Sequence, residues 1–151
     1  MRMRIHIILP FFLLLFSCSP AGYVELTIAG EGSIVPEEVD RLFISYRFYS
    51  EGEGSEVMTE GYEVETLPQT VVVERGSTYD YGVSFTVNGY KGGQWKIVKY
   101  TSALFPGEGA QEVLITLEPE CLDEDCPENE HCELRDGAGT CANNENPGFP
   151  E

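Results

Sequence analysis

Residues 79–87 read YDYGVSFTV, and this stretch decides the fold class. Apolar or aromatic side chains stand at every second position from Tyr79 to Val87, with polar residues or glycine between them. A period of two is the spacing of a strand that buries one face, whereas a helix repeats every third or fourth residue. The stretch therefore predicts a half-buried β-strand.

The same period recurs on both sides of this strand, so we expect about seven strands between residues 23 and 118. The other six cover residues 24–28, 42–48, 56–65, 70–75, 94–102 and 111–117. Turns rich in glycine or containing proline separate them, as chain reversal requires. The only helical feature that we expect is a single turn at residues 37–41.

Short strands with one apolar face need a second sheet to cover that face. The sequence therefore predicts an all-β fold, an antiparallel β-sandwich of immunoglobulin-like or prealbumin-like type, with a small closed barrel as the alternative. No cysteine lies in residues 23–118, so the intersheet disulfide of immunoglobulin domains is missing and the strand order stays open. Strands that run up and down would place the first and last ends of the domain at opposite poles.

The chain is strongly acidic, with 9 Lys and Arg against 26 Asp and Glu and a formal charge of −17 over 151 residues. So few cations cannot neutralise a phosphate backbone, which argues against nucleic acid as a partner. A hydrophobic fraction of 42% with 11% aromatics is too high for a disordered acidic chain. We therefore expect one packed domain with short appendages.

The N-terminus has the pattern of an export signal. Two arginines within residues 1–4 precede a mostly apolar run at residues 5–16, which is too short to remain as a membrane span. The sequence Leu15-Phe16-Ser17-Cys18 resembles the lipobox of bacterial lipoproteins. This resemblance implies a signal peptide at residues 1–17, acylation of Cys18 and a short tether through residue 22. Ser19 after the cysteine favours the outer membrane.

Cleavage after Ala21 by ordinary signal peptidase is the alternative, and it would release a soluble secreted protein. Either cut removes Arg2 and Arg4, leaving a charge of −19.

Four cysteines cluster near the C-terminus, at Cys121, Cys126, Cys132 and Cys141. An even cluster in an exported chain predicts two disulfides, with the connectivity open. The spacing, with the glycine-containing turn at residues 136–140 just before Cys141, resembles the first four cysteines of an EGF-like module. That resemblance implies the pairs Cys121–Cys132 and Cys126–Cys141, in a half module at residues 119–141. We expect residues 142–151 to be a disordered tail.

Zinc and calcium are alternatives for this segment, but no metal site is expected. The four cysteines with His131 could supply zinc ligands, although structural zinc sites favour closer cysteine pairs. Six acidic residues could supply calcium ligands, although they fit neither the EF-hand pattern nor the calcium-binding EGF pattern. These are Asp123, Glu124, Asp125, Glu128, Glu130 and Glu133. We interpret them as a solvated loop and His131 as a surface residue.

The sequence offers no catalytic constellation and no cofactor motif. One histidine beyond the signal and no nucleophile elbow leave no triad to assemble, so we expect a protein that is not an enzyme. Aromatic residues are more informative, because outward-facing rings on a sandwich bind sugars or proteins. The candidate ligand-binding residues are Phe43, Tyr49, Tyr90 and Trp95.

The expected function is that of a lipid-anchored cell-envelope protein, attached to the membrane through Cys18, that binds a protein or glycan partner or has a structural role. The alternative is an accessory carbohydrate-binding or carbohydrate-active domain.

Overall fold

The computed structural model describes most of the chain from residue 21 onwards. The described ranges are residues 21–32, 34–50, 55–64, 66–76 and 80–144. Cys18 with its signal, Tyr79 and residues 145–151 of the expected tail lie outside the described residues.

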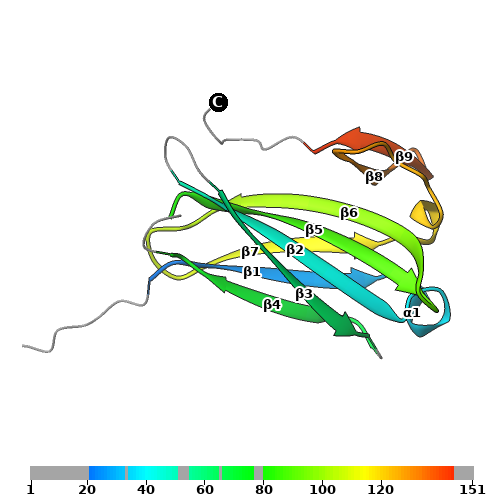
Figure 1. The fold of residues 1–151 in the computed structure, drawn as a ribbon, viewed down its shortest axis with the longest axis horizontal. Coiled ribbons are helices and arrows are strands. Elements are labelled where there is room, and N and C mark those ends of the chain that lie inside the picture. Colours follow the sequence, from blue (N-terminus) through cyan, green and yellow to red (C-terminus); the bar gives the residue numbers. More distant parts are fainter. Residues whose placement is uncertain (1–20, 33, 51–54, 65, 77–79, 145–151) are drawn as a thin grey trace, which may run out of the picture.

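All seven expected strands are present. They are β1 (Tyr23–Gly30), β2 (Arg41–Tyr49), β3 (Ser55–Glu63), β4 (Gln69–Glu74), β5 (Gly82–Lys91), β6 (Gln94–Leu104) and β7 (Ala110–Leu117). They form a three-stranded sheet in the order β4-β1-β7 and a four-stranded sheet in the order β3-β2-β5-β6, which face each other as two layers (Figure 1). The predicted β-sandwich is confirmed, and the two separate sheets are not the closed barrel that was the alternative.

The arrangement differs from a purely antiparallel sandwich at one place, because β1 and β7 run parallel. Tyr23 lies beside Ala110, and Gly30 lies beside Leu117. The start of β1 and the end of β7 therefore do fall at opposite poles, although not through a simple up-and-down order. The order is not that of immunoglobulin domains either, since there the first and second strands share a sheet.

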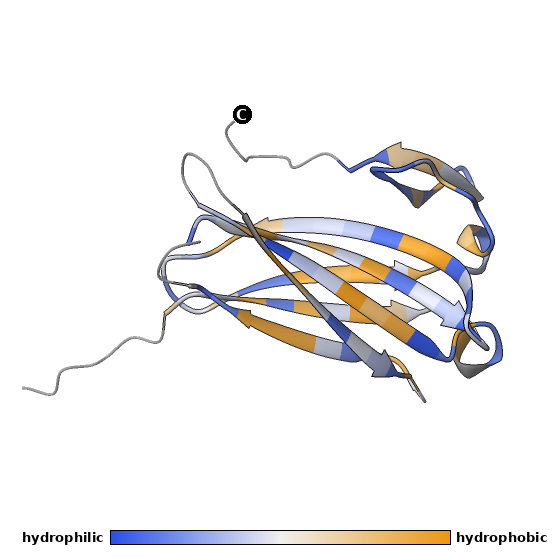
Figure 2. Cartoon of the chain, in the orientation of Figure 1, coloured by the Kyte–Doolittle hydropathy of each residue, from blue (hydrophilic) through white to orange (hydrophobic). Residues whose placement is uncertain are grey.

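Alternation along the strands builds the core between the two sheets. On β1, Val24, Leu26 and Ile28 are fully buried, and on β5 the side chains of Phe85 and Val87 are fully buried. Figure 2 shows hydrophobic and hydrophilic residues alternating along several of these strands. Burial of such side chains contributes about 1.5–3 kcal/mol each and holds the two layers together.

Two local expectations need correction. The helical turn α1 covers Ile34–Glu37 and not residues 37–41, because Ile34 and Val39 are the buried residues that fix its position. Strand β5 begins at Gly82 and not at residue 79; the N–H of Tyr81 still donates to the carbonyl of Tyr49, at 3.0 Å.

The C-terminal segment is a small disulfide-linked unit. A 3-10 turn, η1 (Pro119–Cys121), leads into a hairpin of β8 (Glu130–Arg135) and β9 (Ala138–Asn143). The disulfides join Cys121 to Cys132 and Cys126 to Cys141, the pairs that the EGF-like resemblance implied. Strand β9 continues to Asn143, so the expectation of disorder was wrong for residues 142–143, which pair with residues 130 and 131.

Lys99 attaches this unit to the sandwich. It pairs with the buried Val87 in the β5–β6 ladder, so its side chain starts on the inner face of β6. Its Nζ donates to Glu118 Oε2 at 2.8 Å and lies 4.0 Å from Cys121 Sγ. Only 7% of Lys99 is exposed. A second link runs from the N–H of Asp123 to the carbonyl of Lys96.

We predict that Glu118→Gln destabilises the protein by about 3 kcal/mol, because it leaves the buried ammonium of Lys99 without its counter-ion. The free energy of unfolding in urea, measured on the oxidised protein, checks this. The double variant Lys99→Met/Glu118→Leu should recover most of the loss, since an apolar pair replaces both charges.

The matched control is Glu63→Gln, which breaks the 2.8 Å ion pair with Arg41 at an exposed position. An exposed pair contributes at most about 1 kcal/mol. Equal losses for Glu118→Gln and Glu63→Gln would contradict the role given to Lys99.

Candidate functional site

The outer face of the four-stranded sheet carries most of the side chains that could contact a partner. Leu42, Ile44 and Tyr46 of β2 point into the core, so Phe43 and Arg47 point outward. The β2–β5 ladder places outward residues of β5, such as Tyr90, on the same face. The alternation that builds the core therefore also builds this surface.

An aromatic pair stands at the end of this face nearest α1. The rings of Phe43 and Tyr90 meet edge to face, with centroids 5.4 Å apart. They line a hollow of 950 Å³ together with Asp40, Arg41 and Glu63. The structure thus brings together two of the four residues that the sequence singled out.

Glycines let backbone and ring approach closely here. Gly61 lies opposite Phe43 in the β2–β3 ladder, and a Cβ on Gly61 would stand only 2.8 Å from the Phe43 ring. Gly92 and Gly93 form the β5–β6 turn with φ of 56° and 82°, a conformation that favours glycine. The carboxylate of Asp40 accepts from the N–H of Gly92 at 3.0 Å, which ties this turn to the hollow.

The other two candidates lie elsewhere. Trp95 neighbours Tyr90 in the β5–β6 ladder and is half-buried, but it does not line the hollow. Tyr49 lies at the far end of β2, and its hydroxyl is 3.2 Å from Ser84 Oγ. The four aromatic residues therefore do not make one site.

A second, smaller hollow lies around Tyr49, between the sheet and the C-terminal hairpin. It has a volume of 200 Å³, and Arg47, Ser84 and Tyr100 line it from the sheet. Burial raises the pKa of Tyr100, which hydrogen-bonds to Ser84 and Tyr49. Sequence reasoning missed Arg47 and Ser84, because nothing in the local pattern distinguishes them from other polar residues on a solvated strand face.

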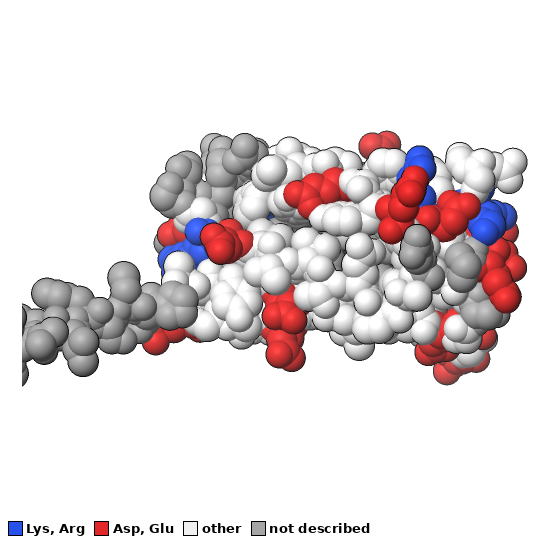
Figure 3. All heavy atoms as spheres, turned by 90° about the horizontal axis from the view of Figure 1, so that it is seen from below, with Lys and Arg blue, Asp and Glu red and all other residues white. Residues whose placement is uncertain are grey.

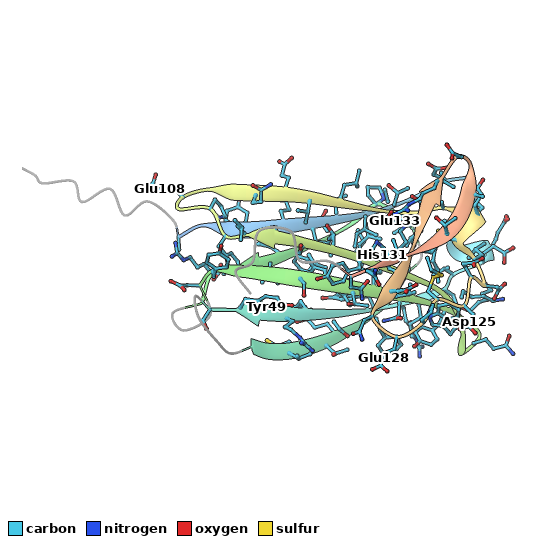
Figure 4. The ribbon with its side chains drawn as sticks, turned by 90° about the horizontal axis from the view of Figure 1, so that it is seen from above. Tyr49, Glu108, Asp125, Glu128, His131 and Glu133 are labelled. Atoms are coloured by element: carbon cyan, nitrogen blue, oxygen red, sulfur yellow. A yellow bond between two sulfur atoms is a disulfide. The ribbon has the colours of Figure 1, made fainter. Side chains whose placement is uncertain are left out.

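His131 is not the surface residue that we expected. It is only 7% exposed, because its ring packs against Tyr100 of β6 at 5.7 Å between centroids. Its Nδ1 lies 2.9 Å from Asn144 Oδ1, and its Nε2 lies 3.3 Å from Glu133. Figure 4 shows His131 on the hairpin where it crosses the sheet. The imidazole therefore has a packing role between hairpin and sandwich.

The acidic residues of the C-terminal segment do not gather around one point. Figure 4 shows Asp125 and Glu128 apart, near the periphery. Within the described ranges, no group of three or more His, Cys, Asp and Glu side chains is placed to hold a metal ion. The four cysteine sulfurs are bonded in pairs and so supply no thiolate for zinc.

Charge is distributed unevenly over the molecule. On the face seen from below in Figure 1, uncharged side chains cover most of the surface, and acidic side chains are scattered over it and are most numerous toward the right-hand end (Figure 3). Across the part of the chain that the structure describes, no helix is long and apolar enough to cross a membrane.

A carboxylate and the two tyrosines that donate to it form the cluster with the largest pKa shifts among the described residues. Glu60 of β3 accepts from the hydroxyl of Tyr46 at 2.9 Å and from that of Tyr62. These hydrogen bonds lower the pKa of Glu60. Burial, and secondly the bond to Glu60, raise the pKa of both tyrosines to about 12. The two hydroxyl groups supply hydrogen bonds to a carboxylate on the edge strand β3. These contacts include no nucleophile.

Comparison with known proteins gives no relative from which to infer a function, since no family model, characterised protein or solved structure matches the chain.

We predict that two tyrosines, Tyr46 and Tyr62, ionise near pH 12, above the value of about 10 for an unperturbed phenol. In the unfolded chain these two tyrosines would ionise at about pH 10, before they do in the folded protein. The stability that they contribute is therefore complete below about pH 10 and is lost as the pH rises through about 12. Ultraviolet absorbance during an alkaline titration checks this.

In Glu60→Gln the pKa of both phenols should fall but stay above 10, because burial, the larger cause, remains. Tyrosines that all titrate together in the folded protein would contradict the assignment.

Proposed function

We propose that this chain is an exported, lipid-anchored protein of the bacterial cell envelope that binds a partner without catalysing a reaction. The observation that carries the binding role is the Phe43–Tyr90 pair, two half-buried rings over a hollow of 950 Å³ on an outer sheet face. Aromatic pairs of this kind supply contact area with little loss of side-chain freedom.

Two disulfides support export, because such bonds persist in oxidising compartments. The lipobox-like residues 15–18 then assign Cys18 as the anchor, with an outer-membrane destination. Only four residues separate Cys18 from Tyr23, a span of at most about 14 Å. The sandwich would stand close to the membrane, with the C-terminal unit at its opposite pole (Figure 1).

The proposal also includes the type of the β-sandwich and of the C-terminal unit. Of the two sandwich types that we expected, the prealbumin-like one is the better match, since the immunoglobulin order is not the observed one. The disulfide pairing supports an EGF-like half module, tied onto β6 in place of its missing third disulfide.

Glycan is the second candidate ligand. The aromatic wall of the hollow stands beside the carboxylates of Asp40 and Glu63, and this combination suits a sugar, whose apolar face packs on rings while its hydroxyls donate to acids. A carbohydrate-active role would require two of these carboxylates to act on a bond, at a separation suited to glycoside hydrolysis.

The anchor predicts a specific intact mass. Protein from its native host should begin at Cys18, carry two or three acyl chains, and release four thiols only after reduction. A lipid-free chain beginning at Gly22 would instead mean a secreted protein, and Cys18→Ser should abolish the lipid mass in the same experiment. Four thiols that react before reduction would contradict the disulfides.

We also predict that Tyr90→Ala weakens binding at the hollow at least about tenfold, or 1.4 kcal/mol, in a glycan array or against an envelope-protein partner. Tyr90→Phe should retain binding because it keeps the ring. Leu114→Ala is the matched control, because Leu114 is 63% exposed on the opposite sheet.

Unchanged unfolding midpoints would show that these variants fold. Binding that is the same in Tyr90→Ala and in Leu114→Ala would refute the hollow as the site. Hydrolysis of a glycan, lost on one carboxylate change, would overturn the non-catalytic assignment.

A further inference from the structure

Arg47 is the one Lys or Arg side chain, among the described residues, that has no carboxylate partner. The other six described cations each lie within 4.0 Å of an acid: Arg41, Arg75, Lys91, Lys96, Lys99 and Arg135. In a chain with 26 acidic residues, pairing is the expected state of a cation. An unpaired guanidinium in a hollow is therefore available to an external anion.

The floor of the hollow beside Arg47 is an ordered set of hydroxyl groups. Ser84 Oγ, on β5, lies 3.2 Å from the hydroxyl of Tyr49, and Ser84 is only 5% exposed. Tyr100 of β6 hydrogen-bonds to both residues. Three strands thus contribute to one network, which fixes these side chains before any ligand arrives.

The C-terminal hairpin supplies the other wall. Asn129 and Asn144 line the hollow from this side. The N–H of Asn144 donates to the carbonyl of Asn129 at 2.8 Å, and the Asn144 side chain is held by His131 at 2.9 Å. The Cys126–Cys141 disulfide links the two segments that carry these asparagines, so the wall is covalently restrained.

We propose that this hollow, the Arg47 site, binds the carboxylate and hydroxyl groups of one acidic sugar residue of a uronic-acid-containing glycan. The guanidinium of Arg47 offers paired N–H donors that match a carboxylate, and no Asp or Glu is among the described residues that line the site. Hydroxyl and amide groups that both donate and accept suit the hydroxyls of a sugar.

Size and charge narrow the ligand further. A volume of 200 Å³ is below the roughly 300–1,000 Å³ of pockets that enclose a drug-sized ligand, so one residue of a longer chain fits. The strong negative charge of the protein disfavours polyphosphates, whereas a single carboxylate meets less repulsion. The lining has little aliphatic surface, with Val57 as its one aliphatic side chain among the described residues, which disfavours an apolar peptide.

Among the described residues, the Arg47 site shares no lining residue with the hollow of Phe43 and Tyr90. Either binding proposal can therefore be wrong without affecting the other. The test is a heteronuclear NMR titration of the oxidised full chain with glucuronic acid, and with glucose as the uncharged counterpart. We expect glucuronic acid to cause saturable chemical-shift changes at Arg47, Ser84 and Asn144. The affinity for glucose should be at least about tenfold lower. Arg47→Gln should lower the affinity for glucuronic acid to that for glucose.

Arg75→Gln is the matched control, because Arg75 does not line the site and pairs with Asp80. Arg47→Lys tests the fork geometry and should recover only part of the affinity. Equal affinity for glucose and glucuronic acid, or binding unaffected by Arg47→Gln, would overturn the proposal. Tighter binding of sulfate or of a peptide C-terminal carboxylate would overturn the assignment to an acidic sugar.

Discussion

The contact of Lys99 with Glu118 and Cys121 holds the C-terminal unit on the sandwich. The shape of the outer face of the four-stranded sheet depends on where that unit lies. The C-terminal unit has too few apolar residues for a core of its own, and its disulfides restrain it without determining where it lies. The buried ammonium of Lys99, which reaches Glu118 just after β7 and Cys121, sets that position together with the link from Asp123 to Lys96. The hairpin is thereby held against β6, with His131 packed on Tyr100.

This placement divides the outer face of the four-stranded sheet into two regions of different chemistry. Near α1 the face is open, and Phe43 and Tyr90 stand over it beside carboxylates. Near Tyr49 the hairpin overlaps the face, and Arg47 lies between hydroxyl and amide groups. Without the hairpin, both regions would belong to one solvated strand face. The two proposed binding regions therefore differ because of a contact made on the inner face of β6.

The sequence predicts the strands well, since a period of two is a local property, and all seven strands and the core follow from it. It does not predict the parallel pairing of β1 with β7, which depends on how distant strands meet. The outward orientation of Phe43 and Tyr90 could be expected from alternation and turn position, but their contact depends on the register of β2 with β5. The availability of Arg47 could not be expected, because its lack of a carboxylate partner among the described residues follows from where the described acids lie in space.

Charge explains why the C-terminal unit needs covalent links. Acidic residues crowd the loop between Cys121 and Cys132, and an unconstrained segment of this composition would remain extended and solvated. Each disulfide loop contributes roughly 3 kcal/mol by restricting the unfolded chain. The strands of the sandwich contain no cysteine, so reduction breaks no covalent link within them. Reduction would consequently remove the wall that Asn129 and Asn144 provide while leaving the Phe43–Tyr90 hollow in place, which makes the Arg47 site alone dependent on an oxidising compartment.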